Sequence, residues 1–232
     1  MTTWLDFWSG SPNIYVNDRH LRVHCDRIAQ DVARLIGSAP GRRVLDFGCG
    51  DALAAPTLAK ATGATLLLYD AASAVCQRLA SRFAGVPNIA VLDDAAWTTR
   101  PAASVDTIVM ISVAQYIGRD DLVGLLERMR IVLTPDGTIL IGDVIPPEAD
   151  LVADLVALLG PATRHGFLGA ALVGLVRTFF SNYRRLRADL GLTNYTEADF
   201  IALAYRAGLH AERLPLNPGF NQKRMAFRAR KI

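Results

Sequence analysis

The sequence has no long hydrophobic run, few cysteines and no excess of charge of one sign. Its longest apolar stretches, 151–160 and 166–176, are too short to span a bilayer as a helix. The three cysteines are odd in number and show no metal-ligand spacing, which indicates reduced thiols in a cytoplasmic protein without a metal site. The first ten residues contain an acid and no basic segment before an apolar run, so we expect no secretory signal.

Charge and composition narrow the possible functions. The chain has 25 Lys and Arg residues against 22 Asp and Glu residues, a balance that does not indicate nucleic-acid binding. Hydrophobic residues make up 51% of the 232 residues, which is enough for a sizeable core and argues against disorder. The length fits one α/β domain with modest additions.

From residue 43 onward, short β-rich runs alternate with helical patterns, as in the crossover units of a parallel sheet. Proline and glycine in the segment 134–137 predict a turn before the fifth strand. We expect strands at 44–48, 65–70, 88–94, 105–112 and 137–145, and closing strands at 210–217 and 223–231. We expect helices at 51–62, in the segment that ends at 84, at 121–133, and at 197–208 after an N-cap at Thr196.

The first 40 residues differ from the rest. Residues 3–20 are rich in aromatics and turn residues, and residues 20–36 have the pattern of an amphipathic helix. We therefore divide the chain into an N-terminal lid and helix, 1–40, and a main domain, 41–232. Within the main domain, residues 151–190 are unusually apolar and predict a helical insertion after the fifth strand.

A glycine-rich turn follows the first predicted strand. The strand must turn abruptly into a helix here, so Gly48 and Gly50 provide both conformational freedom and room for a ligand beside the backbone. Such a turn alone also occurs without a ligand. Asp46 lies inside an apolar strand end, where an unpaired carboxylate is costly, and Asp70 ends the second strand, where an acid can bind a ribose diol. Together these residues predict a nucleoside-binding site.

These residues resemble the first motifs of the class I S-adenosylmethionine-dependent methyltransferases, in particular the branch that acts on small molecules. Asp46, Gly48, Gly50 and Asp51 match the family's first motif, with Ala52 where many members have glycine. The resemblance covers about residues 40–145. It implies a doubly wound, mainly parallel seven-stranded sheet (a Rossmann-like methyltransferase fold) with an antiparallel last strand, and S-adenosylmethionine as the cofactor.

The resemblance also implies roles for single residues. Asp46 would bind the methionine ammonium, the glycine loop would face the methionine carboxylate, and Asp70 would bind both ribose hydroxyls. Asp94 would bind the adenine amine, whereas its neighbour Asp93 fits a turn cap equally well. The full donor-binding set that we expect is Asp46, Gly48, Cys49, Gly50, Asp70, Ala71, Asp94, Ala95, Ser112 and Tyr15.

Candidates for the chemistry are less specific, because a methyl sulfonium is already activated and the protein mainly aligns the reactants and excludes water. Asp143, near the end of the fifth strand, could be a general base or a loop cap. His20 could touch donor or acceptor from the lid, or be a surface histidine. Gln115, after the fourth strand, lies where the family places the acceptor, as does Tyr116; His165 in the insertion is a further possible base.

The insertion bears on the acceptor. Leu172, Leu175, Phe179 and Tyr183 recur at helical spacing, which fits a helix packed over the sheet, a cover over an acceptor pocket or a transient membrane-surface contact. The last two interpretations favour a small, partly hydrophobic acceptor.

Other functions stay open. A nicotinamide dehydrogenase would need a small residue three positions after Gly50, where Leu53 stands. An RNA or protein methyltransferase is disfavoured, because SVAQYI (112–117) replaces the Asn/Asp-Pro-Pro-Tyr/Phe motif after the fourth strand. A non-catalytic S-adenosylmethionine-binding protein is the third alternative. The methylated atom and the oligomeric state cannot be deduced from the sequence.

Overall fold

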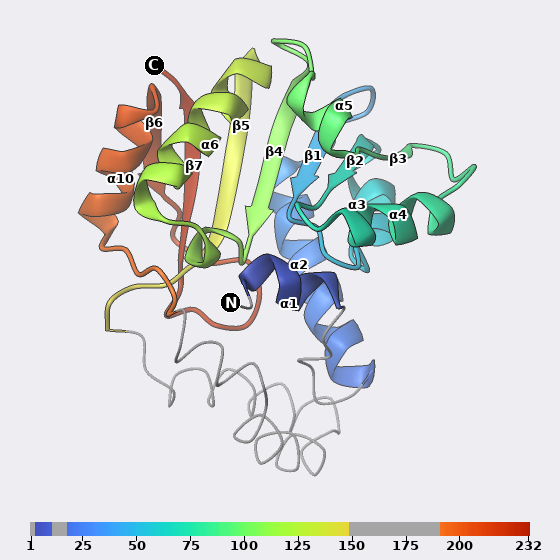
Figure 1. Ribbon diagram of the computed structural model, residues 1–232, viewed down its shortest axis with the longest axis horizontal. Helices are drawn as coiled ribbons and strands as arrows, with labels where there is room; N and C mark the ends of the chain where they lie inside the picture. The colour runs from blue at the N-terminus through green and yellow to red at the C-terminus, as the bar shows by residue number, and fades with distance from the viewer. Residues whose placement is uncertain (1–2, 11–17, 149–190) are drawn as a thin grey trace.

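Runs of leucine, isoleucine and valine form a seven-stranded sheet in the computed structural model, which describes residues 3–10, 18–148 and 191–232 (Figure 1). The strand order is β3-β2-β1-β4-β5-β7-β6, and every neighbouring pair is parallel except the two pairs that contain β7. The predicted doubly wound fold is therefore confirmed. The strands are β1 (Arg43–Phe47), β2 (Thr65–Tyr69), β3 (Ile89–Val91), β4 (Val105–Ile111), β5 (Leu133–Val144), β6 (Leu209–Arg213) and β7 (Met225–Lys231).

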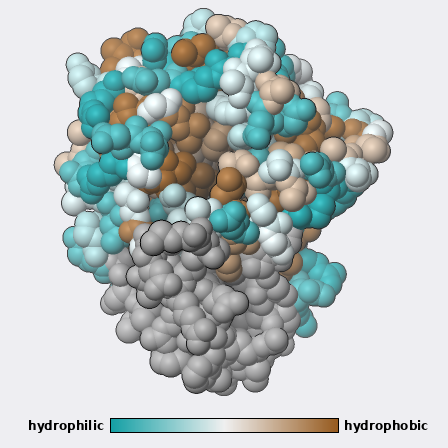
Figure 2. Space-filling view, in the orientation of Figure 1, coloured by the Kyte–Doolittle hydropathy of each residue, from teal (hydrophilic) through white to brown (hydrophobic). Residues whose placement is uncertain are grey.

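Helices cover both faces of the sheet, because the central strands are apolar on both sides. One core packs α5, α6 and α10 against strand residues such as Leu45 and Ile108, and a second core packs α2, α3 and α4 against Val44 and Val109. In Figure 2, hydrophobic side chains gather in the middle of the face that carries α6, with mostly hydrophilic ones to either side. The helices are α1 (Trp4–Ser9), α2 (Asp18–Ile36), α3 (Ala55–Thr62), α4 (Ser73–Arg82), α5 (Asp94–Thr98), the 3₁₀ turn η1 (Ala114–Tyr116), α6 (Arg119–Val132) and α10 (Glu197–Arg206).

Two predicted boundaries are wrong for local reasons. The helix expected from residue 51 begins at Ala55, because Ala52 adopts a left-handed φ of 46° that interrupts the helix, and Pro56 lies in its first turn. The third strand ends at Val91 rather than at 94, because the Asp93 side chain accepts a hydrogen bond from Ala96 N and caps the short helix α5.

The expected turn at 134–137 lies within the bounds of β5. On β4, Val105 pairs with Leu133 and Thr107 pairs with Thr138. The four residues of β5 between Leu133 and Thr138 therefore lie opposite a single residue of β4. Gly137 is required there, since an added Cβ would lie 2.6 Å from Leu133 Cγ and 3.0 Å from Asp106 O. The residues of the predicted turn therefore belong to β5, at an irregularity in its pairing with β4.

The N-terminal helices pack differently from one another. α2 buries Ala29 and Val32 against the body of the domain, whereas α1 has no buried residue and begins with a capping box between Thr3 and Asp6. The domain boundary at residue 40 stays a prediction. The insertion 151–190 lies outside the described residues, and no described helix is long and apolar enough to cross a bilayer.

Candidate functional site

The turn between β1 and α3 is held in shape by left-handed glycines. Gly48 has a φ of 72° and no room for a side chain, since an added Cβ would lie 2.4 Å from Val113 Cγ2. Gly50 has a φ of 52°, but an added Cβ would meet no atom within 4 Å. The two glycines therefore have different roles. Gly48 allows close packing against the segment after β4, and Gly50 leaves open space beside the backbone.

The end of β2 fixes this turn. Gly48 N and Cys49 N donate to Tyr69 O at 2.8 and 3.2 Å, and Gly50 N donates to Asp70 Oδ2 at 3.0 Å. Asp70 Oδ1 also accepts from Ala72 N at 2.9 Å. The three turn amides are thus engaged within the protein and are not the groups that face a ligand carboxylate. Each Asp70 oxygen keeps a second lone pair for a ligand hydroxyl.

Asp46 is the most perturbed acid of the site. Its carboxylate is partly buried at the end of β1, and no described residue forms a hydrogen bond or ion pair with it. Burial, and in second place the Asp70 carboxylate, raises the pKa of Asp46 to about 7. A carboxylate in this setting is stabilised by a cation, so the position suits a positively charged ligand group.

Asp94 lies at the first position of α5, beyond the end of β3. The Tyr69 hydroxyl donates to Asp94 Oδ1 at 2.8 Å, and burial and this contact raise the pKa of Tyr69, so the phenol stays a donor. The second Asp94 oxygen accepts no hydrogen bond from the described residues. Its neighbour Asp93 is the helix cap, so Asp94 is the one of the two acids that keeps an oxygen for another partner, and its role toward a ligand stays a prediction.

Sequence reasoning did not anticipate the support beneath Asp94. Tyr69, Phe47 and Trp97 form an aromatic cluster with ring centroids 5.1 to 5.5 Å apart. Arg128 of α6 lies over the Trp97 ring and donates to the carbonyls of Trp97, Thr98 and Arg100. The sequence signal that could have suggested this cluster is the aromatic residue at the end of each of the first two strands.

Ser112 and Asp143 meet where β4 and β5 end. Ser112 Oγ donates to Asp143 Oδ2 at 2.7 Å, and both residues have a φ of 59°, a region that non-glycine residues rarely adopt. Arg224 Nε lies 3.9 Å from Asp143 Oδ1. Because its carboxylate is already held on both oxygens, Asp143 is better placed to orient the Ser112 hydroxyl than to act as a free base; the base role stays a prediction.

Gln115 lies in η1, just after these strand ends. Its side chain is 6% exposed, and its Oε1 accepts no hydrogen bond from the described residues. An unpaired buried amide oxygen costs free energy that a ligand N–H or O–H can recover. Gln115 is thus a group that would favour a hydrogen-bond donor beside the end of β4.

The sequence of residues 44–137 matches a family model described as a methyltransferase domain. This segment, which is less than half of the chain, is therefore similar to methyltransferase domains. The seven-stranded sheet has the order of a Rossmann-like methyltransferase fold, as the sequence motifs predict. No curated protein matches the chain.

Solved methyltransferase structures share the fold at low sequence identity. A chain of the Haloferax volcanii complex that contains the Trm112 methyltransferase activator has a TM-score of 0.65 and 14% identity, and the match covers 100% of this chain and 99% of that one. Human N-acetylserotonin methyltransferase, solved with S-adenosylmethionine, has a TM-score of 0.61 and 15% identity, with 98% and 55% covered. The chain therefore spans about half of the human enzyme.

A third similar structure is the 1,6-didemethyltoxoflavin-N1-methyltransferase of Burkholderia thailandensis, solved with bound 1,6-didemethyltoxoflavin and S-adenosylhomocysteine. Its TM-score is 0.55 and its identity 16%, and the match covers 90% of this chain and 79% of that chain. At this level of identity, the likenesses establish the fold and nothing finer.

The helix α1 lies at the carboxyl ends of the parallel strands of the sheet (Figure 1). Trp4 and Trp8 contact the ring of Tyr116, at centroid distances of 4.8 and 5.6 Å. On the other side, Arg78 of α4 donates to Ser9 O at 3.5 Å and lies 3.8 Å from Asp51 Oδ1. α1 therefore connects the segment after β4 to the helix after β2. The Thr3–Asp6 capping box is the sequence signal that could have revealed it.

The structure brings most of the expected donor set to one edge of the sheet. Ala71 is exposed directly after Asp70, and Ala95 is exposed beside Asp94. Burial raises the pKa of Cys49, so its thiol stays neutral in the turn. Tyr15 and His165 lie outside the described residues, as does the side chain of His20, so their roles stay predictions.

Proposed function

We propose that the chain transfers a methyl group from S-adenosylmethionine to a small, partly hydrophobic acceptor. The observation that carries the proposal is the unpaired Asp46 carboxylate, whose pKa is raised to about 7, at the strand end that leads into the glycine turn. A methionine ammonium would supply the cation that this carboxylate lacks. Asp70 and Asp94, at the ends of the next two strands of the sheet, would then bind the ribose hydroxyls and the adenine amine.

The chain's contribution to the reaction is alignment. When bound, the donor supplies an activated methyl group, so the protein must fix the direction of attack and exclude water. Ser112, held by Asp143, would fix one side of the donor, and Trp4 and Trp8 would cover it. Gln115 Oε1 would accept a hydrogen bond from an acceptor N–H or O–H.

The proposal for the acceptor rests on the similar structures and on one sequence pattern. The similar structures include enzymes whose names state small molecules, an N-acetylserotonin and a toxoflavin precursor. The expectation of a hydrophobic acceptor comes from the stripe Leu172, Leu175, Phe179 and Tyr183, which lies outside the described residues. Oxygen, nitrogen and carbon acceptors all remain compatible with the site.

Calorimetry with S-adenosylhomocysteine tests the donor site. We expect micromolar or tighter binding by the wild-type protein and no binding of NAD. Asp46→Asn should weaken binding by about ten- to hundredfold, the value of a charge-assisted hydrogen bond of about 1.5–3 kcal/mol. The matched control is Asp51→Asn, which removes an exposed acid of the same turn that pairs only weakly with Arg78.

Equal losses in the two variants would contradict the assignment of Asp46, and binding of NAD without S-adenosylhomocysteine would overturn the proposal. A non-catalytic binding protein is distinguished by turnover. The enzyme should convert S-adenosylmethionine to S-adenosylhomocysteine when small-molecule extract is added, and should not do so with RNA or protein fractions alone.

A further inference from the structure

Strand β5 has an irregularity where it reaches the site. Ile141 pairs with Phe227 of β7, but the next pair is Val144 with Met225, so two residues of β5 lie opposite one residue of β7. Such a bulge leaves a backbone amide without its partner in the sheet. Asp143, with its left-handed φ of 59°, is one of the two bulged residues. Its N–H therefore needs an acceptor from elsewhere.

Asn217 provides that acceptor from the loop between β6 and β7. Asn217 Oδ1 accepts from Asp143 N at 2.8 Å, and Asn217 Nδ2 donates to Pro218 O and Asn221 O, both at 3.1 Å. The residue is 5% exposed. Its oxygen bonds to the bulge, and its nitrogen bonds within its own loop. A buried amide with these bonds has one orientation, so it fixes the Asp143 backbone.

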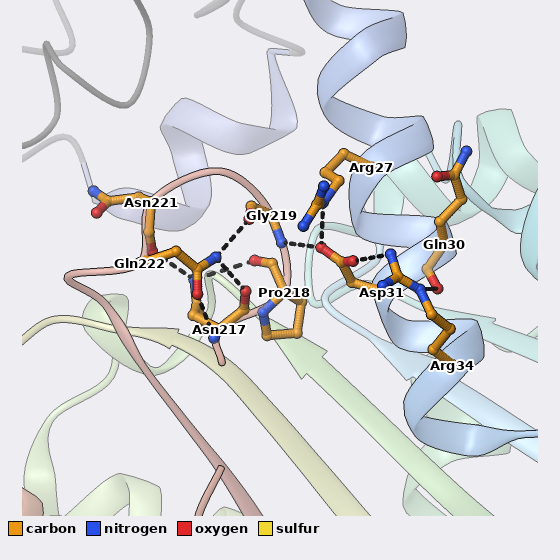
Figure 3. Close-up of polar contacts among 9 residues, drawn as sticks. All are labelled: Arg27, Gln30, Asp31, Arg34, Asn217, Pro218, Gly219, Asn221 and Gln222. Atoms are coloured by element: carbon orange, nitrogen blue, oxygen red, sulfur yellow. Dashed lines mark hydrogen bonds and ion pairs between the residues drawn. The ribbon is translucent and has the colours of Figure 1, made fainter. Parts of the chain in front are cut away.

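The loop that carries Asn217 is anchored on two sides (Figure 3). Gln222 Oε1 accepts from Asn217 N, and Gln222 Nε2 donates to the carbonyls of Asn217 and Gly219. Gly219 N donates to Asp31 Oδ2 of α2 at 2.9 Å, and Asp31 is itself paired with Arg27 and Arg34.

Close approach of the loop to β5 also depends on a glycine. An added Cβ at Gly142 would lie 3.3 Å from Pro218 Cδ and 2.6 Å from Ile111 Cδ1. The absence of a side chain at Gly142 thus lets Pro218 lie against the strand, which brings the adjacent Asn217 within reach of Asp143.

We propose that Asn217 is a positioning residue for methyl transfer: it holds the bulged Asp143, and through it the Ser112 hydroxyl, in the orientation that the bound donor requires. The inference rests on the proposed function, because Ser112 is a donor contact only if the site binds S-adenosylmethionine. Asn217 lies 74 residues from Asp143 in the sequence and acts without touching the donor.

Calorimetry with S-adenosylhomocysteine on three variants tests the proposal. Asn217→Ala removes the acceptor of Asp143 N–H and should weaken binding by about three- to tenfold, as expected for one hydrogen bond. Asn217→Asp keeps an oxygen acceptor but cannot donate to Pro218 O and Asn221 O, so it should lower thermal stability while retaining more affinity than the alanine variant. Gln222→Ala is the matched control, since it weakens the same loop without contacting Asp143.

A merely structural role would lower the melting temperature of all three variants and leave the dissociation constant of the folded protein unchanged. That result would overturn the inference, as would an equal loss of affinity in Gln222→Ala. If Asn217→Ala does not fold, Asn217→Gln decides, because it moves the amide oxygen by one methylene: lost affinity supports the inference and unchanged affinity overturns it. Failure of the wild-type protein to bind at all would instead reject the proposed function.

Discussion

At the scale of single residues, Asp46 is a carboxylate at a strand end whose burial disfavours its ionised form, so that a bound cation would stabilise it. Its neighbours in the sheet are the apolar Leu68 of β2 and Val109 of β4, so its carboxylate is held in a poorly solvated place. Because burial raises its pKa to about 7, the folded protein binds this proton more tightly than the unfolded chain. The stability of the free protein should therefore fall as pH rises from about 4 to 7.

Binding of the donor should show the opposite trend with pH. Only the ionised Asp46 pairs with an ammonium, and for a pKa of about 7 its ionised fraction falls roughly 25-fold between pH 7.5 and 5.5. We expect the affinity for S-adenosylhomocysteine to fall by a similar factor over this interval, measured by calorimetry. Asp46→Asn should bind weakly with a flat profile, and a parallel slope in that variant would assign the titration to another group.

The residues that sequence reasoning found and missed differ in one physical respect. Asp46 and Asp70 were predictable, because each follows directly from an apolar strand and a glycine turn that fixes where the strand ends. Tyr69 and Asn217 were not, since their roles depend on contacts with Asp94 and Asp143 at separations of 25 and 74 residues. Periodicity within one segment carries no information on such contacts.

At the scale of elements, the same distinction holds. The parallel strands were predicted to within a few residues, since continuous apolar runs are required when both faces are buried. The five-residue helix α5 was missed, because its apolar content does not exceed that of the preceding strand and only the Asp93 cap marks it. α1 was expected only as a lid-forming segment, and its helical form depends on the Thr3–Asp6 cap.

The helix α1 should respond to the donor. It has no buried residue, and its contacts to the body include the rings of Trp4 and Trp8 against Tyr116 and the hydrogen bond from Arg78 to Ser9 O. We expect amide hydrogen exchange in α1 to slow when S-adenosylhomocysteine is added, because ordering over a ligand closes local openings.

Tyr116→Ala should reduce that protection, since it removes the ring on which both tryptophans pack, a contact of about 0.5–1.5 kcal/mol beyond burial. The control is Tyr205→Ala, which removes an exposed tyrosine of α10. Exchange in α1 that is the same with and without ligand would show that this helix is a fixed part of the domain.

At the scale of the whole molecule, the candidate ligand-binding residues and a part of the stabilising core lie at opposite edges of the doubly wound sheet. The strand order reverses between β1 and β4, and the carboxyl ends on either side of this point carry Asp46 and Ser112. Ligands bind at such a switch point in open α/β sheets. The opposite, amino-terminal edge of the parallel strands is packed by residues such as Leu133 at the start of β5, which is fully buried and distant along its strand from Asp143.

This separation predicts that stability and donor affinity can be changed independently. Leu133→Ala should lower the free energy of unfolding by about 2–5 kcal/mol, because it leaves a cavity in a buried cluster, and the melting temperature by roughly 5–15 °C. Affinity of the folded protein for S-adenosylhomocysteine should stay within about twofold of the wild type. Ile131→Ala, on the half-exposed side of the neighbouring turn of α6, is the matched control and should change neither quantity appreciably. Thermal unfolding with and without ligand measures both effects, and a tenfold loss of affinity in Leu133→Ala would mean that the core at the amino-terminal edge controls the geometry of the site.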